Sequence, residues 1–290
     1  MSWPVNQVNY FSSVKAKKRL STIIILSFLI IGSIVLLFPI WWMLSTSLKS
    51  MQEIMQFPPT FFPKEIHWDN YVKTLQSAPF LGYALNTLFI TVSVVIANVV
   101  MNSFIAYGFS KIYFKGRNAL FMIVLSTMMI PGFVTLIPQY VFFSKIGWIN
   151  TYFPLIIPAL FGNAFFIFLL RQYFMTIPNE LIEAAKIDGA SHFYIWLKLM
   201  IPLTKPALAT VAIFSFNGAW NDFLGPLLYV NEQYMYTLQI GLAFFKGHVS
   251  TEWNYLMAGS LLVLLPVIIL FFIFQRYFIE GMNITAGTKG

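Results

Sequence analysis

The chain has 290 residues, of which 58% are hydrophobic and 10% are charged, and its formal net charge is +8 at pH 7. A soluble domain is usually about half apolar and about a quarter charged, so this composition excludes an ordinary soluble protein. No cysteine is present, which excludes disulfides and thiolate-bound metals or clusters. The three histidines lie far apart, at positions 67, 192 and 248, and they indicate no metal site.

The apolar residues are gathered in uncharged blocks. A membrane-spanning helix needs about 20 mostly apolar residues to cross a hydrocarbon core of about 30 Å. Five blocks are long enough without a charge, and a sixth becomes so by continuing past Asp222 to residue 230. The blocks are residues 21–42, 74–110, 118–144, 146–170, 206–221 and 253–275. They predict an all-α, polytopic membrane protein with six transmembrane helices, because one soluble core cannot bury so many runs and because their polarity does not alternate as in a β-barrel.

The predicted segments follow in chain order. Residues 1–20 form a cytoplasmic tail rich in lysine and arginine before the first span, residues 21–44. That span is longer than a signal-peptide core and no small-residue cleavage site follows it, so we expect it to be retained. An outer loop, residues 45–84, contains "FPPTFFPKEIHWDNY" and is expected to be ordered but irregular. Residues 85–280 hold the other five spans, and residues 281–290 form a cytoplasmic tail.

Basic residues near the helix ends set the predicted orientation. With the N-terminus inside, 13 of the 18 lysine and arginine residues fall in cytoplasmic segments. We therefore expect both termini in the cytoplasm. The net charge reports this topology, since nucleic-acid binding would need a basic face with interleaved aromatic residues, which the sequence lacks.

Two prolines, Pro131 and Pro138, interrupt the third span in "MMIPGFVTLIPQY". Proline removes an intrahelical hydrogen bond and clashes one turn back. In a bilayer such a break is tolerated where neighbouring helices or a cavity satisfy the backbone. Two interpretations stay open: a kinked helix lining a pathway, or a bend near the outer surface.

A charged passage, residues 174–205, lies between the fourth and fifth spans on the cytoplasmic side. It predicts a helix that Asn179 can cap, with Glu180 and Glu183 near its positive N-terminal end. Gly189 stands where a left-handed C-terminal cap is expected. The passage therefore reads as a helix, a glycine and a second helix, which we call the elbow.

The second helix of the elbow can begin at Ser191, and Pro202 and Pro206 are expected to end it. Its apolar stripe has helical spacing: Phe193, Trp196, Leu197 and Met200. Physics leaves two interpretations open, docking of a cytoplasmic partner or an amphipathic helix in the lipid interface. The two acids of the first helix disfavour the lipid-interface interpretation, because the inner leaflet is anionic.

A resemblance favours docking. The stretch "EAAKIDG", from Glu183 to Gly189, resembles the core of the "EAA" loop of ABC importer permeases, although after nine intervening residues Leu199 stands where isoleucine is usual. Further likeness to the second permease subunit of the carbohydrate uptake (maltose-type) group extends over residues 40–290. It includes "LNTLFIT", "GWINTYFPLIIPALF", "DGAS" and "WNDFLGPLLYV".

The resemblance implies a type I ABC importer permease fold in the bacterial cytoplasmic membrane. It implies a second homologous permease, two ATPase subunits that hold ATP and magnesium, an external solute-binding protein and a carbohydrate substrate. This chain itself is expected to bind no cofactor and to catalyse no reaction. Glu183 would pair with the ATPase and Gly189 would form the turn. The other expected coupling residues are Glu180, Ala184, Ala185 and Asp188. The tail "GMNITAGTKG" departs from the usual family form.

Asp222 is the only ionisable residue within the predicted spans, and intramembrane acids often mark a functional site. Amides and an aromatic ring nearby suit sugar hydroxyls, although a clamp between helices or an acid at the interface explains the carboxylate equally. The other expected pathway residues are Asn86, Asn163, Asn217, Trp220 and Asn221. The sugar itself is left open among polyols, oligosaccharides, uronate oligomers and glycerol phosphate esters.

An ion-coupled secondary transporter is the alternative function. Proton or sodium coupling usually needs buried acids or histidines in several helices and often shows internal repeats. One acid and no evident repeat count against it. A membrane-embedded enzyme ranks lower, since no catalytic set clusters in the sequence and no Walker A or GxGxxG motif is present.

Overall fold

The computed structural model describes residues 6–247 and 251–285. The regular secondary structure of these residues is helical apart from one isolated antiparallel bridge, Lys246 with Thr251. The elements are α1 (Asn6–Ser47), α2 (Met51–Ile54), α3 (Asp69–Gln76), α4 (Phe80–Lys111), α5 (Arg117–Ser126), η1 (Thr127–Met129), α6 (Gly132–Lys145), α7 (Phe153–Ile156), η2 (Ile157–Phe161), α8 (Ala164–Met175), α9 (Asn179–Ile187), α10 (His192–Ile195), η3 (Trp196–Met200), α11 (Ile201–Leu203), α12 (Lys205–Trp220), α13 (Leu224–Tyr229), η4 (Gln233–Met235), α14 (Leu238–Ala243) and α15 (Trp253–Thr285). This confirms the all-α prediction.

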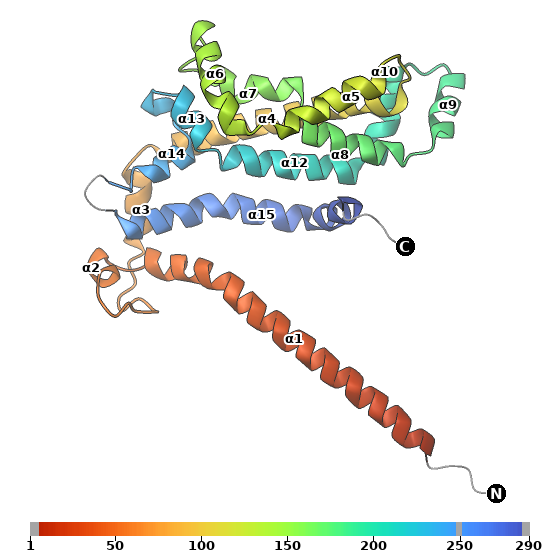
Figure 1. Ribbon diagram of the computed structural model, residues 1–290. Coiled ribbons are helices and arrows are strands. Elements are labelled where there is room, and N and C mark those ends of the chain that lie inside the picture. The colour runs from red at the N-terminus through yellow and green to blue at the C-terminus, as the bar shows by residue number, and fades with distance from the viewer. Residues whose placement is uncertain (1–5, 248–250, 286–290) are drawn as a thin grey trace, which may run out of the picture.

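The body of the molecule is a stack of long helices whose axes lie roughly parallel to one another (Figure 1). The helix α4 packs against both α8 and α12, and α12 also packs against α15. The helix α1 contacts α15 but leaves the body at an angle, and its most apolar stretch is not buried within the chain. Helix α9 lies at one end of the stack, whereas α2, α3, α13 and α14 lie at the other.

Four helical segments are long and apolar enough to span a membrane, and two bent helix pairs raise the number to six if each pair is one span. The four are Arg19–Ser47, Phe80–Lys111, Phe153–Met175 and Trp253–Arg276. Four of the predicted blocks overlap these segments, and the other two overlap the bent pairs. The block that starts at residue 206 does not continue as one helix to residue 230, because α12 ends at Trp220 and a separate helix, α13, follows the break at Asp222. The first helix is longer than predicted, because α1 begins at Asn6 within the proposed tail. Of the predicted C-terminal tail, residues 286–290 lie outside the described residues.

The first bend has a local cause. Arg117–Met129 and Gly132–Lys145 meet at 97°, and Ile130 between them is extended (φ −81°, ψ 116°). A residue before proline avoids the helical region, so Pro131 ends one helix and caps the next, while Pro138 stays inside α6. The second pair meets at 84° around Thr204. The second helix of the elbow ends at Leu203, between Pro202 and Pro206, as the sequence predicted.

The outer loop is ordered by buried polar groups, as its irregular sequence requires. The Glu53 carboxylate is buried and accepts hydrogen bonds from Thr60 Oγ1 (2.7 Å) and from the backbone N–H of Lys64 (3.1 Å). The buried Lys49 ammonium donates to the carbonyl of Thr60 (2.5 Å). Burial lowers the pKa of Lys49, although the nearby Glu53 partly offsets this. The loop is thus a folded cap on one end of the helix stack.

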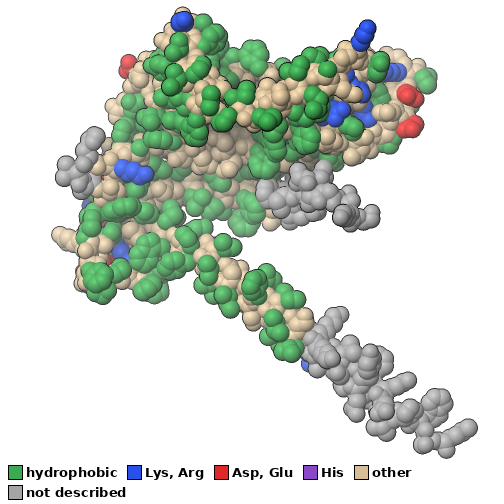
Figure 2. All heavy atoms as spheres, viewed as in Figure 1, with side chains coloured by type: hydrophobic (Ala, Val, Ile, Leu, Met, Phe, Trp, Pro, Cys, Tyr) green, Lys and Arg blue, Asp and Glu red, His purple; other side chains and the backbone are tan. Residues whose placement is uncertain are grey.

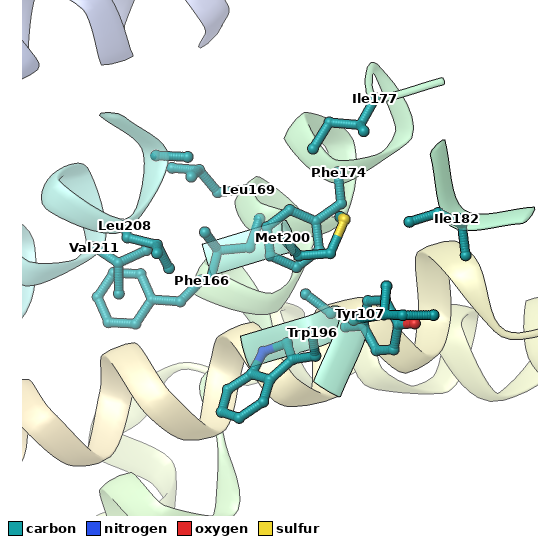
Figure 3. Close-up of a cluster of buried hydrophobic side chains, with 14 residues drawn as sticks. Tyr107, Phe166, Leu169, Phe174, Ile177, Ile182, Trp196, Met200, Leu208 and Val211 are labelled. Atoms are coloured by element: carbon teal, nitrogen blue, oxygen red, sulfur yellow. The ribbon is translucent and has the colours of Figure 1, made fainter. Parts of the chain in front are cut away.

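Two hydrophobic clusters hold the body together. The first, which we call the elbow cluster, joins α4, α8, α9, η3 and α12 and is drawn in Figure 3. Its buried members include Tyr107, Phe166, Ile182, Trp196 and Met200. The second cluster, around Phe80, Trp220 and Val263, joins α4, α12 and α15. A fully buried side chain of this size contributes roughly 1.5–3 kcal/mol, so the elbow cluster fixes the charged passage firmly to the spans.

Candidate functional site

The elbow turns at Gly189 as the sequence predicted. Its φ is +82°, the left-handed region that glycine reaches at low cost. The N–H of Ala190 donates to the carbonyl of Ala185 (3.0 Å), and that of Gly189 donates to the carbonyl of Lys186 (3.0 Å). This pair of bonds is a Schellman motif, which satisfies the last carbonyls of α9. Ser191 then caps α10 by accepting from the N–H of Tyr194 (3.2 Å).

The predicted cap at the other end of α9 is wrong. Asn179 is the first helical residue, Pro178 occupies the cap position, and no side chain caps this end. The Asn179 Oδ1 instead accepts from the Lys111 ammonium (2.8 Å), which also donates to the carbonyl of Ile177 (2.6 Å). Lys111 at the end of α4 therefore ties together the end of α8 and the start of α9, a contact between segments too distant in sequence to be predicted.

The predicted apolar stripe of the second helix is buried at only two of its four positions. Trp196 and Met200 are buried, but Phe193 and Leu197 are exposed on the isolated chain, and Ile195 is buried instead. The reason is the π-helical turn η3, which widens the helix and shifts its register against the 3.6-residue repeat. The elbow therefore packs through a face that simple helical periodicity does not give.

The helix α9 has two faces. Ile182 is 3% exposed within the elbow cluster, and the half-buried Ala185 packs against the same cluster. The other predicted coupling residues are exposed: Glu180, Glu183, Ala184, Asp188 and Gly189. Ile187 beside them is 86% exposed, a residue that sequence reasoning missed. A carboxylate-bearing surface with small and exposed apolar side chains suits a protein partner rather than water alone.

The elbow is also bonded to the spans. The buried Tyr107 hydroxyl of α4 lies 2.9 Å from His192 Nδ1 at the start of α10. The Arg171 Nε of α8 donates to the carbonyl of Phe109 in α4 (3.2 Å). The first bond ties α10 to α4, and the second ties α8 to α4. The elbow is thus connected to α4 directly and to α8 through the elbow cluster.

A polar cavity of about 310 Å³ lies between α4, α8, α12 and α13. Two of the predicted pathway residues, Asn163 and Asp222, line it. Four further polar residues that sequence reasoning missed also line it: Thr87, Asn98, Ser215 and Thr237. The hydroxyl oxygens of Ser215 and Thr237 are buried and have no hydrogen-bond partner among the described residues. Unpartnered buried hydroxyls are costly, so this cavity is suited to a polar occupant.

An amide chain supports one wall of the polar cavity. Asn102 Nδ2 donates to Asn98 Oδ1 (3.1 Å), and Asn102 Oδ1 accepts from the backbone N–H of Asn163 (2.6 Å). Asn163 in turn caps α8 by accepting from the N–H of Phe165 (3.0 Å). The i, i+4 spacing of Asn98 and Asn102 inside an apolar block was a usable signal for this wall.

The Asp222 carboxylate is held at the break between α12 and α13. Its Oδ1 accepts from the backbone N–H of Gly225 (3.0 Å). A Cβ atom on Gly225 would collide with that carboxylate and would stand 2.9 Å from Leu155 Cδ2. Glycine is therefore required for Asp222 to approach the chain this closely.

The other predicted pathway residues lie elsewhere. Asn86 Nδ2 donates to the carbonyls of Tyr234 (2.8 Å) and Tyr236 (3.0 Å), which fixes the segment before α14. Trp220 is 4% exposed and donates from Nε1 to the carbonyl of Val263 in α15 (3.1 Å), so it packs in the core. Asn217 and Asn221 are exposed and bonded to each other (2.8 Å).

Comparison with known protein families decides the identity of the chain. Residues 98–284 match the family described as binding-protein-dependent transport system inner membrane component. The chain belongs to this family of transport permeases. The match includes the elbow and most of the polar cavity.

Relatives of this permease extend over nearly its whole length. It is 34% identical to an arabinooligosaccharide transport system permease protein of Halalkalibacterium halodurans, over 95% of this chain and 99% of the relative. It is 32% identical to an sn-glycerol-3-phosphate transport system permease protein of Rhizobium meliloti, over 92% and 97%. A crystal structure of a bacterial ABC transporter involved in import of the acidic polysaccharide alginate aligns with a TM-score of 0.78 and 26% identity, over 96% and 100%.

Family membership confirms the coarser predictions. The chain is a multi-pass inner-membrane permease of a binding-protein-dependent ABC importer. It is not itself catalytic, and ATP is handled by separate ATPase subunits. This sets aside the ion-coupled secondary transporter as the alternative function.

Proposed function

We propose that this permease forms half of a carbohydrate pathway and couples it to ATP hydrolysis through α9. A second, homologous permease supplies the other half, an external solute-binding protein delivers the sugar, and two ATPase subunits supply the energy. The observation that carries the proposal is the exposed carboxylate face of α9, fixed to the spans by the elbow cluster.

In this mechanism the ATPase binds the exposed face of α9. Glu183 offers a carboxylate to a basic or hydrogen-bonding group, and Ala184 allows close approach. Ile187 fills an apolar recess of the partner. Because Ile182 and Ala185 pack into the elbow cluster, a movement of the ATPase is transmitted to α4 and α8 rather than absorbed by a loose loop. ATP-driven closure of the ATPase pair then switches the access of the pathway from one side of the membrane to the other.

The proposal includes the predicted orientation and domain order. The tail 1–20, the elbow 174–205 and the tail 281–290 face the cytoplasm, and the loop 45–84 faces outward. The described ends of α1 and α15 lie toward the end of the stack that carries α9, which supports a shared side (Figure 1). The core of residues 85–280 carries the pathway.

The cargo we propose is a neutral sugar or oligosaccharide. Among the described residues, Asp222 is the only charged one that lines the polar cavity, and its carboxylate, where ionised, would repel a phosphate ester or a uronate. Amides and hydroxyls of Asn98, Asn163, Ser215 and Thr237 supply donors and acceptors that match sugar hydroxyls. One named relative handles arabinooligosaccharides, which agrees with such a cargo.

Charge reversal tests the docking. Replacing Glu183 with lysine should lower ATP-dependent uptake about tenfold or more, since one charge-assisted contact is worth about 1.5–3 kcal/mol. The chain should remain in the membrane, because Glu183 is exposed. Uptake into proteoliposomes with the purified ATPase and binding protein measures this. The control is Glu65→Lys, an equal charge change on an exposed residue of the outer loop. Undiminished uptake in Glu183→Lys would refute docking through this carboxylate.

A second test addresses the cargo. Asp222→Asn keeps the shape of the side chain but removes its charge, and we expect the uptake rate at saturating binding protein to fall about tenfold. Asn221→Ala is the matched control, because Asn221 is a neighbour that does not line the polar cavity. Equal rates for Asp222→Asn and the parent chain would exclude sugar contact at this carboxylate.

A further inference from the structure

A second polar cavity, of about 370 Å³, lies beside the elbow where α4, α5, α8 and α9 meet. We call it the basic cavity. Its polar lining consists of Ser110, Lys111, Arg117, Asn179, Glu183 and Lys186. Three of these side chains are cations and one is a carboxylate, so the cavity favours an anion. Neither the predicted coupling set nor the predicted pathway uses Lys111, Arg117 or Lys186.

Over residues 6–247 and 251–285, the three cations form no direct ion pair, although Glu180 interacts electrostatically with Lys111. Within the described residues, none of them lies within ion-pair distance of an aspartate or glutamate. Lys111 donates to the carbonyl of Ile177 and to Asn179 Oδ1, and Arg117 Nη1 donates to the carbonyl of Ile112 (3.3 Å). These acceptors are all neutral. Arg117 has five N–H donors and Lys111 three, so both keep donors for a ligand.

Two helix ends add positive potential to the basic cavity. The ten-residue α5 begins at Arg117 after Gly116, and α9 begins at Asn179; neither start has a side-chain cap. Both first residues line the cavity. Uncapped first-turn N–H groups and the helix dipole favour an anion at such positions. Glu183 in the lining and the nearby Glu180 oppose this, but these two exposed carboxylates are outnumbered by three cations.

The position of the basic cavity indicates where the anion comes from. Two membrane-length segments, Phe80–Lys111 and Phe153–Met175, end at residues that line it. It therefore lies at the boundary between hydrocarbon and water, the level of the lipid headgroups. Tyr113 on its rim is 90% exposed, as expected of an aromatic side chain at the membrane interface. Figure 2 shows lysine and arginine side chains gathered at this end of the molecule, beside exposed hydrophobic ones.

We propose that the basic cavity binds the phosphate headgroup of an anionic glycerophospholipid. Arg117 and Lys186 would pair with the phosphate oxygens, and Lys111 would donate its remaining N–H. The acyl chains would then run along the exposed apolar side chains of α5, such as Leu120 and Met122. Basic pockets at the ends of transmembrane helices bind anionic headgroups in this way. The proposal concerns lipid binding through Lys111, Arg117 and Lys186. The basic cavity shares only Glu183 with the surface proposed for ATPase docking.

The test is lipid retention by the full-length chain purified with its transporter partners. Native mass spectrometry would follow titration with phosphatidylglycerol, with phosphatidylcholine as the zwitterionic comparison. We expect preferential retention of phosphatidylglycerol and about a tenfold loss of apparent affinity in Arg117→Gln/Lys186→Gln, since charge-assisted bonds are lost. Lys115→Gln is the control, because Lys115 is an exposed lysine of the same turn that does not line the cavity.

The outcomes separate the possibilities. Undiminished retention in the double variant, or an equal loss in Lys115→Gln, overturns the site. Displacement of the lipid by inorganic phosphate at a similar concentration overturns the lipid assignment in favour of a free anion. Should the double variant fold poorly, Lys186→Gln alone serves, because this exposed side chain is removed without loss of packing. It should lose several-fold affinity, and parental affinity would overturn the role of Lys186.

Discussion

Gly189 shows how a single backbone position controls the elbow. A Cβ atom added there meets nothing within 4 Å, so alanine is opposed only by the φ of +82°, a cost of about 1 kcal/mol. Proline would also fix φ near −65° and remove the N–H that donates to Lys186. We expect Gly189→Ala to retain most uptake and Gly189→Pro to abolish uptake while the ATPase still hydrolyses ATP. Gly147→Ala, at another open position with positive φ, controls for strain alone. Full uptake in Gly189→Pro would contradict the role of the turn.

Gly225 tests the same logic at the polar cavity. Gly225→Ala must push the Asp222 carboxylate away and weaken the bond from its own N–H, because the added Cβ collides with that side chain. We expect a fall in uptake about as large as in Asp222→Asn. The two changes should be strongly non-additive in a double-mutant cycle, since they remove one arrangement. Additive effects on the uptake rate would show that Gly225 acts independently of Asp222.

The elements themselves were largely predictable, but their breaks and registers were not. Uncharged block length predicted the spans because the hydrocarbon core demands it, and Gly189 and Ser191 carried the local chemistry of the turn. The 84° bend at Thr204 and the π-helical turn η3 were not predicted from the helical periodicity of the sequence. Asn163 and Asp222 could be predicted as cavity residues because each is a polar residue in an apolar block. Trp220 was wrongly predicted to line the pathway, because its ring packs in the second hydrophobic cluster.

The bond between Tyr107 and His192 allows a test of the connection between the elbow and the spans. Tyr107→Phe deletes one hydroxyl from a buried ring and leaves the elbow cluster packed, so the stability cost should be about 1 kcal/mol. We expect faster amide exchange in α10, unchanged exchange in α15, and less sugar transported per ATP hydrolysed. Thr176→Val, which removes an exposed hydroxyl near the elbow, should alter none of these. Unchanged exchange in α10 of Tyr107→Phe would show that the bond does not hold the elbow.

At the scale of the whole molecule, the same three helices, α4, α8 and α12, carry both candidate functional regions, the polar cavity and the elbow cluster. On α4, Asn98 lines the polar cavity and Tyr107 belongs to the elbow cluster, a separation of about 14 Å along the helix. On α12, Ser215 lines the polar cavity and Val211 belongs to the elbow cluster, while Phe166 of α8 belongs to both. A rotation of the elbow cluster therefore moves the wall of the polar cavity directly, without an intervening hinge.

Such a mechanism requires the elbow and the segment before α14 to face opposite sides of the membrane. The absence of cysteine makes this measurable, because each introduced thiol is the only one in the chain. Lys115→Cys, in the exposed turn beside the elbow, should react with a membrane-impermeant maleimide only in inside-out vesicles. Tyr234→Cys, at a side chain that is 73% exposed, should react only in right-side-out cells. Labelling of both from one side would contradict the six-span topology, and reversed labelling would invert the orientation and remove α9 from the reach of a cytoplasmic ATPase.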